Sequence, residues 1–384
     1  MSARLGVTGG DGSIADELAH RTLELCSIPS ETRFEKELAD EVEALCQRIA
    51  GRPSVRRIGN SVLCDPVGGF GGADSGSNAP PTVALVGHLD TVKCAEQQPT
   101  EIRDGRVYGC GSSDMKAGVA TMFALLDRWK LLTGARPIWI FYDKEEGPNE
   151  ENGLEPVLES GVLPALDLAI VLEPTDRSLQ MGCMGTAHAT VTVHGKRAHS
   201  ARPWQGENAI YRSITLLRKF AGLQRREVVF GDLTFYEVMV VTKVRTENSA
   251  NVVPDRVMLN VNLRFAPGRS SADALADLRE LVDGEGDIEV TDTAPSGRVY
   301  LDHPLIEPWR HRLGLATAPK QAWTDVARFT ERGIPAVNFG PGETAQAHQS
   351  GEWCSIDSLV YNFEALMDFF GAAGATVDGG TAAE

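Results

Sequence analysis

Short, almost wholly apolar runs alternate with helical patterns along the first half of the chain. The apolar runs cover residues 82–88, 137–143 and 168–174, and helical spacing of apolar residues marks 14–50, 113–132 and 153–160. Strands that are apolar throughout are buried on both faces, and helices between them indicate parallel neighbours. We therefore predict an α/β fold whose central mixed, largely parallel sheet is flanked by helices.

The pattern changes at about residue 184. Residues 187–195 and 256–265 alternate apolar and polar side chains, which is typical of an antiparallel sheet with one exposed face. Helical patterns cover 208–221 and 271–283, and the α/β texture returns with the run 334–341 and a last helix that begins after Ser355. These changes predict a discontinuous α/β domain, residues 1–183 and 298–384, with a separate α+β domain inserted at 184–297.

Polar side chains suited to metals follow the apolar runs of the first half. His88 ends one run, Glu145 and Glu146 come shortly after the second, and Glu173 lies near the end of the third. Sites in open α/β sheets lie outside the carboxyl ends of the strands, so we expect these side chains to converge. Asp90, two residues after His88, points to the same side of an extended segment and can hold the second ring nitrogen of that histidine.

Asp114 and His348 complete the candidate metal ligands. Asp114 follows a glycine-rich turn and opens a helix, and His348 lies in the late segment PGETAQAHQSGE. Each residue also has a plain structural explanation, such as a helix N-terminal acid or a turn histidine. Two imidazoles and three carboxylates suit zinc, with cobalt or manganese as substitutes, and five ligands suit two metals that share a bridging carboxylate.

The adjacent acids Glu145 and Glu146 need not have the same role. Side chains of consecutive residues diverge, so Glu146 can bind a metal while Glu145 acts as general base on a water molecule. The alternative is a solvated acidic turn, because the segment EEGPNEENG is acidic throughout.

Composition narrows the classes of partner. The chain has 384 residues, which favours two domains, and its net charge of -16 disfavours nucleic acid and anionic membranes. No apolar run is long enough to span a membrane. The seven cysteines are scattered without a CxxC pair, which predicts reduced thiols and a cytoplasmic location.

The order of these motifs resembles a known enzyme family. H-x-D, G-x-x-D-M-K, E-E-G, E-P and a late histidine are similar to the zinc-dependent family of desuccinylases, acetylornithine deacetylases, aminoacylases and related exopeptidases. The resemblance implies a cis peptide bond after the bridging acid, Asp90 orienting a histidine, and Glu145 as the base. It also implies the following metal ligands: His88 and Glu173 on one zinc, Glu146 and His348 on the other, and Asp114 between them.

The inserted domain carries further motifs of this family. The segment GKRAHSARP resembles one whose histidine, here His199, reaches the active site of the partner in a homodimer formed through the inserted domain. There it would stabilise the oxyanion. Asn251 and Arg264 lie in segments that resemble substrate-binding ones; without the resemblance they read as a turn asparagine and a sheet-surface arginine. Arg202 and Arg328 are further candidates for binding substrate carboxylates.

Several phrases, such as WTDVARFTERGIPAVNFGPG, resemble succinyl-diaminopimelate desuccinylases of the actinobacterial type. The implied reaction is hydrolysis of an N-succinyl amide to succinate and LL-diaminopimelate, on a route to lysine and cell-wall precursor. An acetylornithine-type deacetylase, or another N-acyl amino acid hydrolase, including one of a secondary-metabolite pathway, stays open. A non-catalytic scaffold is disfavoured because no motif is missing, and the glycines of 68–76 lack the strand and helix of a dinucleotide site.

Overall fold

A computed structural model describes residue 5 and residues 12–70, 79–94 and 99–371. From residue 71 on, the glycine-rich stretch 68–76 lies outside the described residues. The chain divides into two compact units. Unit 1 comprises Met1–Met181, Tyr300–Ala318 and Arg332–Glu384, and unit 2 comprises Gly182–Val299 and Pro319–Glu331.

The segment Pro319–Glu331 differs from the sequence-based division, which placed it with the α/β domain. It carries α8 (Val326–Glu331) and belongs to unit 2. Backbone contacts give the reason: the Met184 amide donates to the Ala322 carbonyl at 3.1 Å, and the Arg298 amide donates to Thr330 Oγ1 at 3.2 Å. The helical and strand patterns of the sequence do not predict such long-range contacts.

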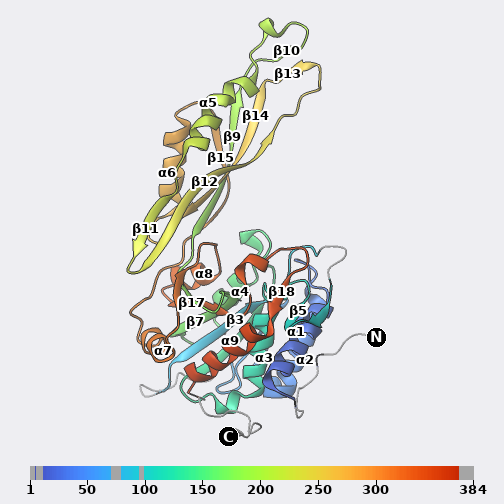
Figure 1. The fold of residues 1–384 in the computed structure, drawn as a ribbon, viewed down its shortest axis with the longest axis vertical. Coiled ribbons are helices and arrows are strands. Elements are labelled where there is room, and N and C mark those ends of the chain that lie inside the picture. Colours follow the sequence, from blue (N-terminus) through green and yellow to red (C-terminus); the bar gives the residue numbers. More distant parts are fainter. Residues whose placement is uncertain (1–4, 6–11, 71–78, 95–98, 372–384) are drawn as a thin grey trace. The chain divides into compact units, whose positions relative to one another are not determined.

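The central sheet of unit 1 is mixed, and its middle strands are parallel (Figure 1). The middle strands β6, β3, β7 and β17 are apolar and buried because helices and loops cover both faces. In spatial order the strands are β1 (Val55–Ile58), β2 (Ser61–Cys64), β6 (Arg136–Tyr142), β3 (Thr82–His88), β7 (Leu168–Pro174), β17 (Ala336–Gly340), β8 (Leu179–Met181) and β16 (Thr317–Pro319).

The helices of unit 1 form where apolar residues recur at helical spacing. Helix α3 lies against β3 and β7 and is buried along almost its whole length, and α1 and α9 pack against it. Ser13 and Ser355 cap the first turns of α1 and α9, as expected of serine before a helix. The helices are α1 (Ile14–Ser27), α2 (Lys36–Ala50), α3 (Lys116–Asp127), α4 (Leu154–Glu159), α7 (Ile306–Leu313) and α9 (Ile356–Phe369).

A small antiparallel sheet lies beside α1 and α9. Its strands, in spatial order, are β18 (Trp353–Ser355), β5 (Arg106–Tyr108) and β4 (Glu101–Arg103). The register pairs Trp353, the first residue of β18, with Tyr108, the last residue of β5. The residues just before β18 therefore lie next to the turn that follows β5.

A disulfide joins Cys94 to Cys110, with 5.7 Å between their Cα atoms. The expectation of reduced thiols is therefore wrong for this pair, and it holds for Cys26, Cys46, Cys64, Cys183 and Cys354, which are free and buried. The pairing has no sequence signature of its own, because it arises when the segment after β3 meets the turn before α3.

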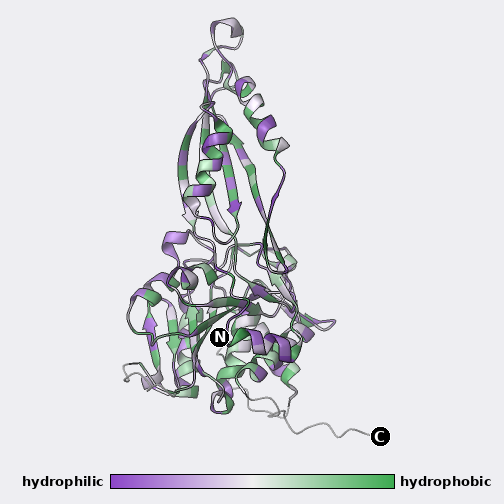
Figure 2. Cartoon of the chain, turned by 90° about the vertical axis from the view of Figure 1, so that its left-hand side faces the viewer, coloured by the Kyte–Doolittle hydropathy of each residue, from purple (hydrophilic) through white to green (hydrophobic). Residues whose placement is uncertain are grey.

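Unit 2 is built on an antiparallel sheet with α5 (Ala209–Gly222) and α6 (Ser271–Val282) packed on one face. Figure 2 shows hydrophobic and hydrophilic residues alternating along its strands. The apolar side chains of β9 and β14 face the helices, and the polar ones face away. In spatial order the strands are β11 (Arg226–Phe230), β12 (Leu233–Arg245), β14 (Arg256–Phe265), β9 (Gly185–His194) and β15 (Asp287–Ala294).

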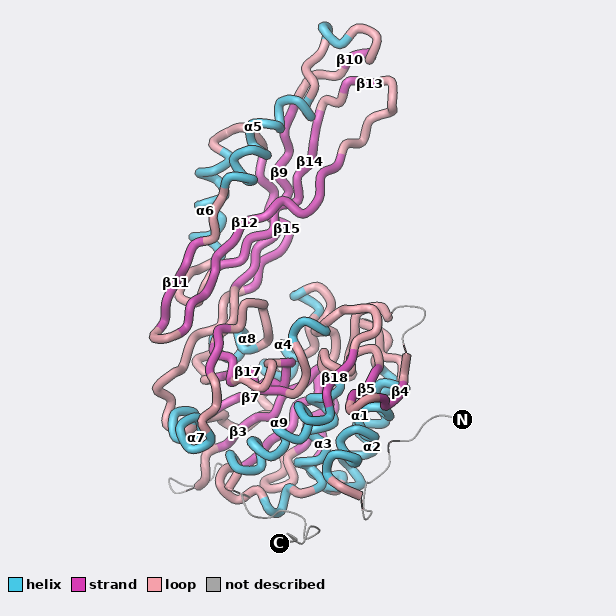
Figure 3. The backbone as a smooth tube through the Cα atoms, viewed as in Figure 1, coloured by secondary structure: helices cyan, strands magenta, loops and turns pink. Residues whose placement is uncertain are grey.

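Unit 2 also has a separate short ribbon and a strand edge that is only partly paired. A separate two-stranded ribbon, β10 (Ala198–His199) with β13 (Val252–Val253), lies beyond the ends of β9 and β14 (Figure 3). On β12, β11 covers only 233–237, so among the described strands none pairs with the outer edge of 238–245. Across the described parts of both units, every helix is too short or too polar to cross a membrane.

Candidate metal centre

Three neighbouring strands of unit 1 deliver the candidate ligands to one edge of the sheet. β6, β3 and β7 are parallel neighbours, so their carboxyl ends meet. His88 is the last residue of β3, Glu173 is the last but one of β7, and β6 leads through a turn into Glu145 and Glu146. Lys144, just before the two acids, has a left-handed φ of 59° in this turn.

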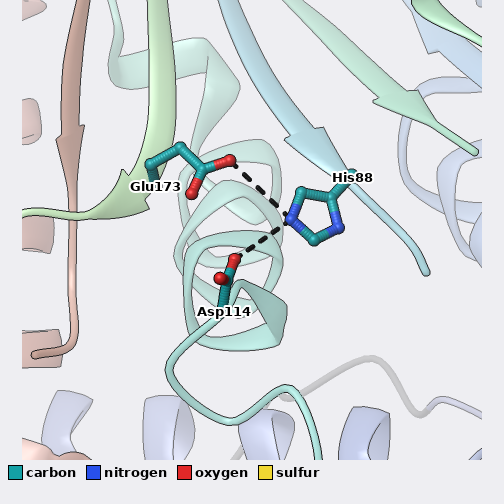
Figure 4. A group of neighbouring side chains, drawn as sticks. All are labelled: His88, Asp114 and Glu173. Atoms are coloured by element: carbon teal, nitrogen blue, oxygen red, sulfur yellow. Dashed lines mark hydrogen bonds and ion pairs between the residues drawn. The ribbon is translucent and has the colours of Figure 1, made fainter. Parts of the chain in front are cut away.

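The first group of ligands consists of His88, Asp114 and Glu173 (Figure 4). His88 Nε2 lies 3.2 Å from Asp114 Oδ1 and 3.7 Å from Glu173 Oε1. The imidazole and both carboxylates face a common point, and His88 is completely buried. One nitrogen and two oxygens in this arrangement can hold a divalent cation.

The second group consists of Asp114, Glu146 and His348. His348 Nε2 lies 2.8 Å from Glu146 Oε1 and 3.6 Å from Asp114 Oδ2. Asp114 thus presents Oδ1 to the first group and Oδ2 to the second. A carboxylate placed in this way can bridge two cations.

Asp90 lies behind His88 and is completely buried. Nδ1 of His88 lies 3.0 Å from the Asp90 carbonyl oxygen and 3.5 Å from its carboxylate, which favours a proton on Nδ1 and leaves Nε2 for a metal. The Asp90 carboxylate also accepts the backbone amides of Glu145 and Glu146 at 2.9 and 3.0 Å. One side chain therefore holds both the histidine and the acidic turn, and its contact with the turn could not be predicted from the H-x-D spacing.

The electrostatics of the cluster favour added positive charge. Burial alone would lower the pKa of His88, but hydrogen bonds to Asp114 and Asp90 raise it well above its usual value. The hydrogen bond to Glu146 raises the pKa of His348 to about 9. Burial raises the pKa of Glu146. Carboxylates this close are stabilised by a cation, and the nitrogen and oxygen donors fit zinc.

Glu145 lies at the edge of this cluster. A carboxylate oxygen of Glu145 lies within 4.8 Å of ligand atoms of both His88 and Glu146. It is partly exposed, in contrast to the buried His88. Its position allows it to take a proton from a molecule located between the two ligand groups.

The turn that carries Asp114 is held by a residue that the sequence analysis did not single out. Glu352 is buried, and its carboxylate accepts the backbone amides of Gly111, Ser113 and Asp114. Burial raises the pKa of Glu352 to about 7, although these hydrogen bonds act in the opposite direction. The peptide bond between Asp114 and Met115 is cis, as the resemblance implied.

Three candidates of unit 2 lie together on the β10–β13 ribbon. The backbone amide of Ser200, next to His199, donates to the Asn251 carbonyl, and the Arg202 amide donates to the His199 carbonyl. All three candidate side chains are exposed. His199 Nδ1 accepts the Ala201 amide at 3.0 Å, which places the proton of a neutral ring on Nε2 and makes Nε2 a donor.

The two other arginine candidates lie elsewhere in unit 2. Arg264 is near the opposite end of β14, eight residues after Arg256, and a strand of that length spans about 27 Å. It is half-buried on the polar face, and burial lowers its pKa. Arg328 is buried and donates to Asp325 Oδ1 at 2.7 Å, which does not favour a role in binding a substrate carboxylate.

Residues 84–371 match the family described as Peptidase family M20/M25/M40. A Mycobacterium tuberculosis protein that bears the name succinyl-diaminopimelate desuccinylase DapE is 36% identical over 91% of this chain and 97% of its own length. The succinyl-diaminopimelate desuccinylase of Corynebacterium glutamicum is 35% identical over 88% of this chain and 92% of its own. The acetylornithine deacetylase of Myxococcus xanthus is 29% identical over 76% and 79%.

Solved structures share the fold at low sequence identity. An M20 family metallo-carboxypeptidase from Sulfolobus solfataricus matches with a TM-score of 0.72 at 16% identity, over 94% of this chain and all of its own. A dinuclear metal binding peptidase of the family from Bacillus subtilis matches with a TM-score of 0.65 at 15% identity, over 94% and 99%. The family match and the relatives that span most of both chains show that this chain belongs to the M20/M25/M40 peptidase family of metal-dependent hydrolases, which act on amide bonds.

Proposed function

We propose that the chain is a di-zinc amidohydrolase that cleaves N-succinyl-LL-2,6-diaminopimelate to succinate and LL-diaminopimelate. The observation that carries the chemistry is the pair of three-ligand groups that share Asp114, with Glu145 beside them. The names of the two relatives at 35–36% identity support the choice of substrate.

His88 and Glu173 would hold one zinc, Glu146 and His348 the other, and Asp114 would bridge them. Cobalt or manganese could take the same places, because both accept nitrogen and oxygen ligands. Divalent cations in these positions would lower the pKa of a water molecule and polarise the amide carbonyl.

Glu145 would act as the general base. It takes a proton from the attacking water as the water oxygen bonds to the carbonyl carbon of the succinyl group. When the carbon–nitrogen bond breaks, the same proton goes to the leaving amine. Asp90 supports this step indirectly, since it fixes the backbone of Glu145 through a 2.9 Å hydrogen bond.

His199 would donate to the oxyanion that develops during the attack. Its Nδ1 is occupied by the Ala201 amide, so Nε2–H is the free donor of a neutral ring. A neutral donor of this kind stabilises the developing charge without adding a permanent positive charge to the site.

The separation of candidates in unit 2 supports a homodimer. A small substrate cannot contact both Arg264 and the β10–β13 ribbon of one chain, because about 27 Å of β14 separate Arg264 from the ribbon end of the sheet. Because the resemblance assigns His199 to the substrate of the partner chain, Asn251 and Arg202 beside it would contact the same substrate, and Arg264 would contact a different substrate molecule.

The surface of unit 2 offers an interface for such a dimer. No described strand pairs with the outer edge of 238–245 on β12, and Val240 and Val244 on this segment are exposed. Ile210 and Ile214 add an exposed apolar stripe on α5, and an apolar groove of about 450 Å³ lies between this helix and β12. An open edge with apolar flanks favours pairing with a second copy of the same strand.

The substrate would be recognised by its carboxylates. Arg264 has Asn262 Oδ1 as hydrogen-bond acceptor at 3.2 Å and is not paired with an acid in the described residues. A guanidinium that keeps donors available suits a carboxylate, and a local positive group is needed because the chain carries a net charge of -16. The cytoplasmic location stays a prediction.

The test is turnover of matched substrates by the zinc-loaded enzyme. N-succinyl-LL-diaminopimelate should be hydrolysed with a kcat/KM about 100-fold above that of N-acetylornithine, because a site with a carboxylate-binding arginine rejects a substrate that lacks the carboxylate. The reverse preference would move the assignment to a deacetylase.

The acetylornithine-type reaction is the second candidate. It is supported by the Myxococcus xanthus relative, although that protein is less similar and covers less of the chain. The same catalytic groups would serve it, because only the acyl group and the amino acid differ.

A further inference from the structure

Glu352 lies between the paired strands β18 and β5 and the turn that carries Asp114. It immediately precedes β18, and the pairing of Trp353 with Tyr108 places it opposite the turn that follows β5. The Gly109 amide donates to the Glu352 carbonyl at 3.2 Å and continues this pairing by one residue. The side chain then lies under the segment Gly109–Asp114, with 3% of its surface exposed.

Both carboxylate oxygens of Glu352 accept backbone amides of that segment. Oε2 accepts the Gly111 amide at 2.8 Å, and Oε1 accepts the amides of Ser113 and Asp114 at 2.7 and 2.9 Å. These three N–H groups, here termed the amide nest, converge on one anion, as in backbone sites for bound anions. The amide nest therefore fixes the main chain of Asp114, the candidate bridging ligand.

Other contacts show that the turn has little freedom around this anion. Gly111 has a φ of +76°, and a Cβ there would come within 2.5 Å of the Thr91 side chain. Ser113 Oγ donates to the Glu343 carbonyl and accepts the Glu343 amide, each at 3.0 Å. The amide nest is thus connected twice to the late segment 343–352.

That late segment also carries His348. Its φ of 62° is a left-handed conformation, which is uncommon for residues other than glycine. Glu352 is four residues further on and fastens the end of this segment to the Asp114 turn. The carboxylate therefore links the two segments that supply Asp114 and His348, while it lies outside both ligand groups.

We propose that Glu352 is a positioning residue for the metal pair, which sets the location of the Asp114 carboxylate through its backbone and keeps the His348 segment next to it. The inference rests on the metal site of the proposed function. It does not depend on which amide is hydrolysed.

Replacement of Glu352 should therefore weaken zinc binding in a protein that still folds. In E352Q, a single carbonyl oxygen can accept part of the amide nest, while the new NH₂ group faces amides that also donate. Outer partners of metal ligands typically account for a 10- to 100-fold change in metal affinity, and we expect a loss of about that size.

The measurement is a titration of the metal-free protein with zinc against a chelator of known affinity. The visible spectrum of the cobalt-loaded protein reports in parallel on ligand geometry, which a merely structural residue would leave unchanged. The matched control is D357N, which removes a negative charge five residues away on a side chain that is 90% exposed. Its zinc affinity and cobalt spectrum should equal those of the wild type.

E352D provides a second variant if E352Q fails to fold, because it keeps the charge and shortens the reach by one methylene. A zinc affinity within twofold of wild type in the folded variant, together with an unchanged cobalt spectrum, overturns the proposal and leaves the proposed function intact. Absence of zinc binding by the wild type would overturn both.

Discussion

In unit 1, candidate ligands from residue 88 to residue 348 lie within 4 Å of a neighbour in the cluster. His88 and Glu173 are buried, Asp114 and Glu146 are partly buried, and only His348 is exposed among the five. In unit 2, Arg328 is buried, while the other candidate substrate residues are exposed or half-buried and divide into two groups at opposite ends of the sheet. The fold of unit 1 by itself brings the candidate metal ligands close together. The candidates of unit 2 are not gathered into one such cluster.

The difference follows from the kind of chemistry expected of each unit. Cations and a general base need fixed distances, and buried strand ends with Asp90 and Glu352 behind them provide such distances. Groups that close over a substrate must first be accessible to solvent. Exposure of His199 is therefore consistent with a role that begins only when substrate and a second chain are present.

The largest expected effect concerns Glu145, beside the candidate metal ligands of unit 1. Glu145→Gln should retain its zinc and lose activity by about 10²- to 10⁴-fold in kcat, since general-base catalysis contributes that much. Steady-state kinetics together with metal analysis would check it. Glu150→Gln, which changes an exposed acid five residues further along the chain, is the control and should keep its rate. A Glu145 variant above about a tenth of the wild-type kcat would remove the base role.

The next effect concerns unit 2. His199→Ala should lower kcat by about 10²- to 10³-fold as an oxyanion donor is lost, whereas His194→Ala, which changes an exposed histidine at the end of β9 in the same unit, should not. Doubly tagged heterodimers of His199→Ala and Glu145→Gln chains test which chain supplies the histidine. If it comes from the partner, one of two sites is intact and about half of the wild-type activity returns. Heterodimers as inactive as the single variants would show that each chain uses its own histidine.

A smaller effect is the pH dependence of metal binding. It concerns unit 1 and not unit 2, because all the candidate metal ligands belong to unit 1. In the metal-free protein the pKa of His348 is about 9, because of its hydrogen bond to Glu146. A metal needs the neutral ring, so binding below this pH releases a proton. The apparent affinity should rise by at least about tenfold per pH unit below pH 9, because His88, whose pKa is also raised, must lose its proton as well. Calorimetry in buffers of different ionisation enthalpy measures the proton release, and heats that are independent of buffer would contradict the prediction.

Much of this organisation could be predicted from local patterns. The runs 82–88 and 168–174 are strands with the predicted bounds, and the acids and histidine after them do meet at one edge. The period of a strand and the direction of a parallel sheet are enough for that inference. His348 is a weak candidate ligand from the residues alone, and only the resemblance assigns it to the same metal as Glu146, because nothing in its surrounding sequence predicts that contact.

The remainder depends on contacts that no local pattern encodes. Glu352 meets residues about 240 positions earlier because two three-residue strands pair, and strands that short have no periodic signal. Cys94 and Cys110 pair for a similar reason. Arg328 looked available in the sequence, but burial beside Asp325 gives its charge a partner within the fold.

The Cys94–Cys110 bond also has a bearing on how the protein is handled at the bench. Thiol reductants used in storage buffers would cut it, and the same thiols compete for zinc, so a preparation could lose activity through either route. A phosphine reductant compared with dithiothreitol would separate the two, since both open the bridge and only the thiol is a strong zinc ligand.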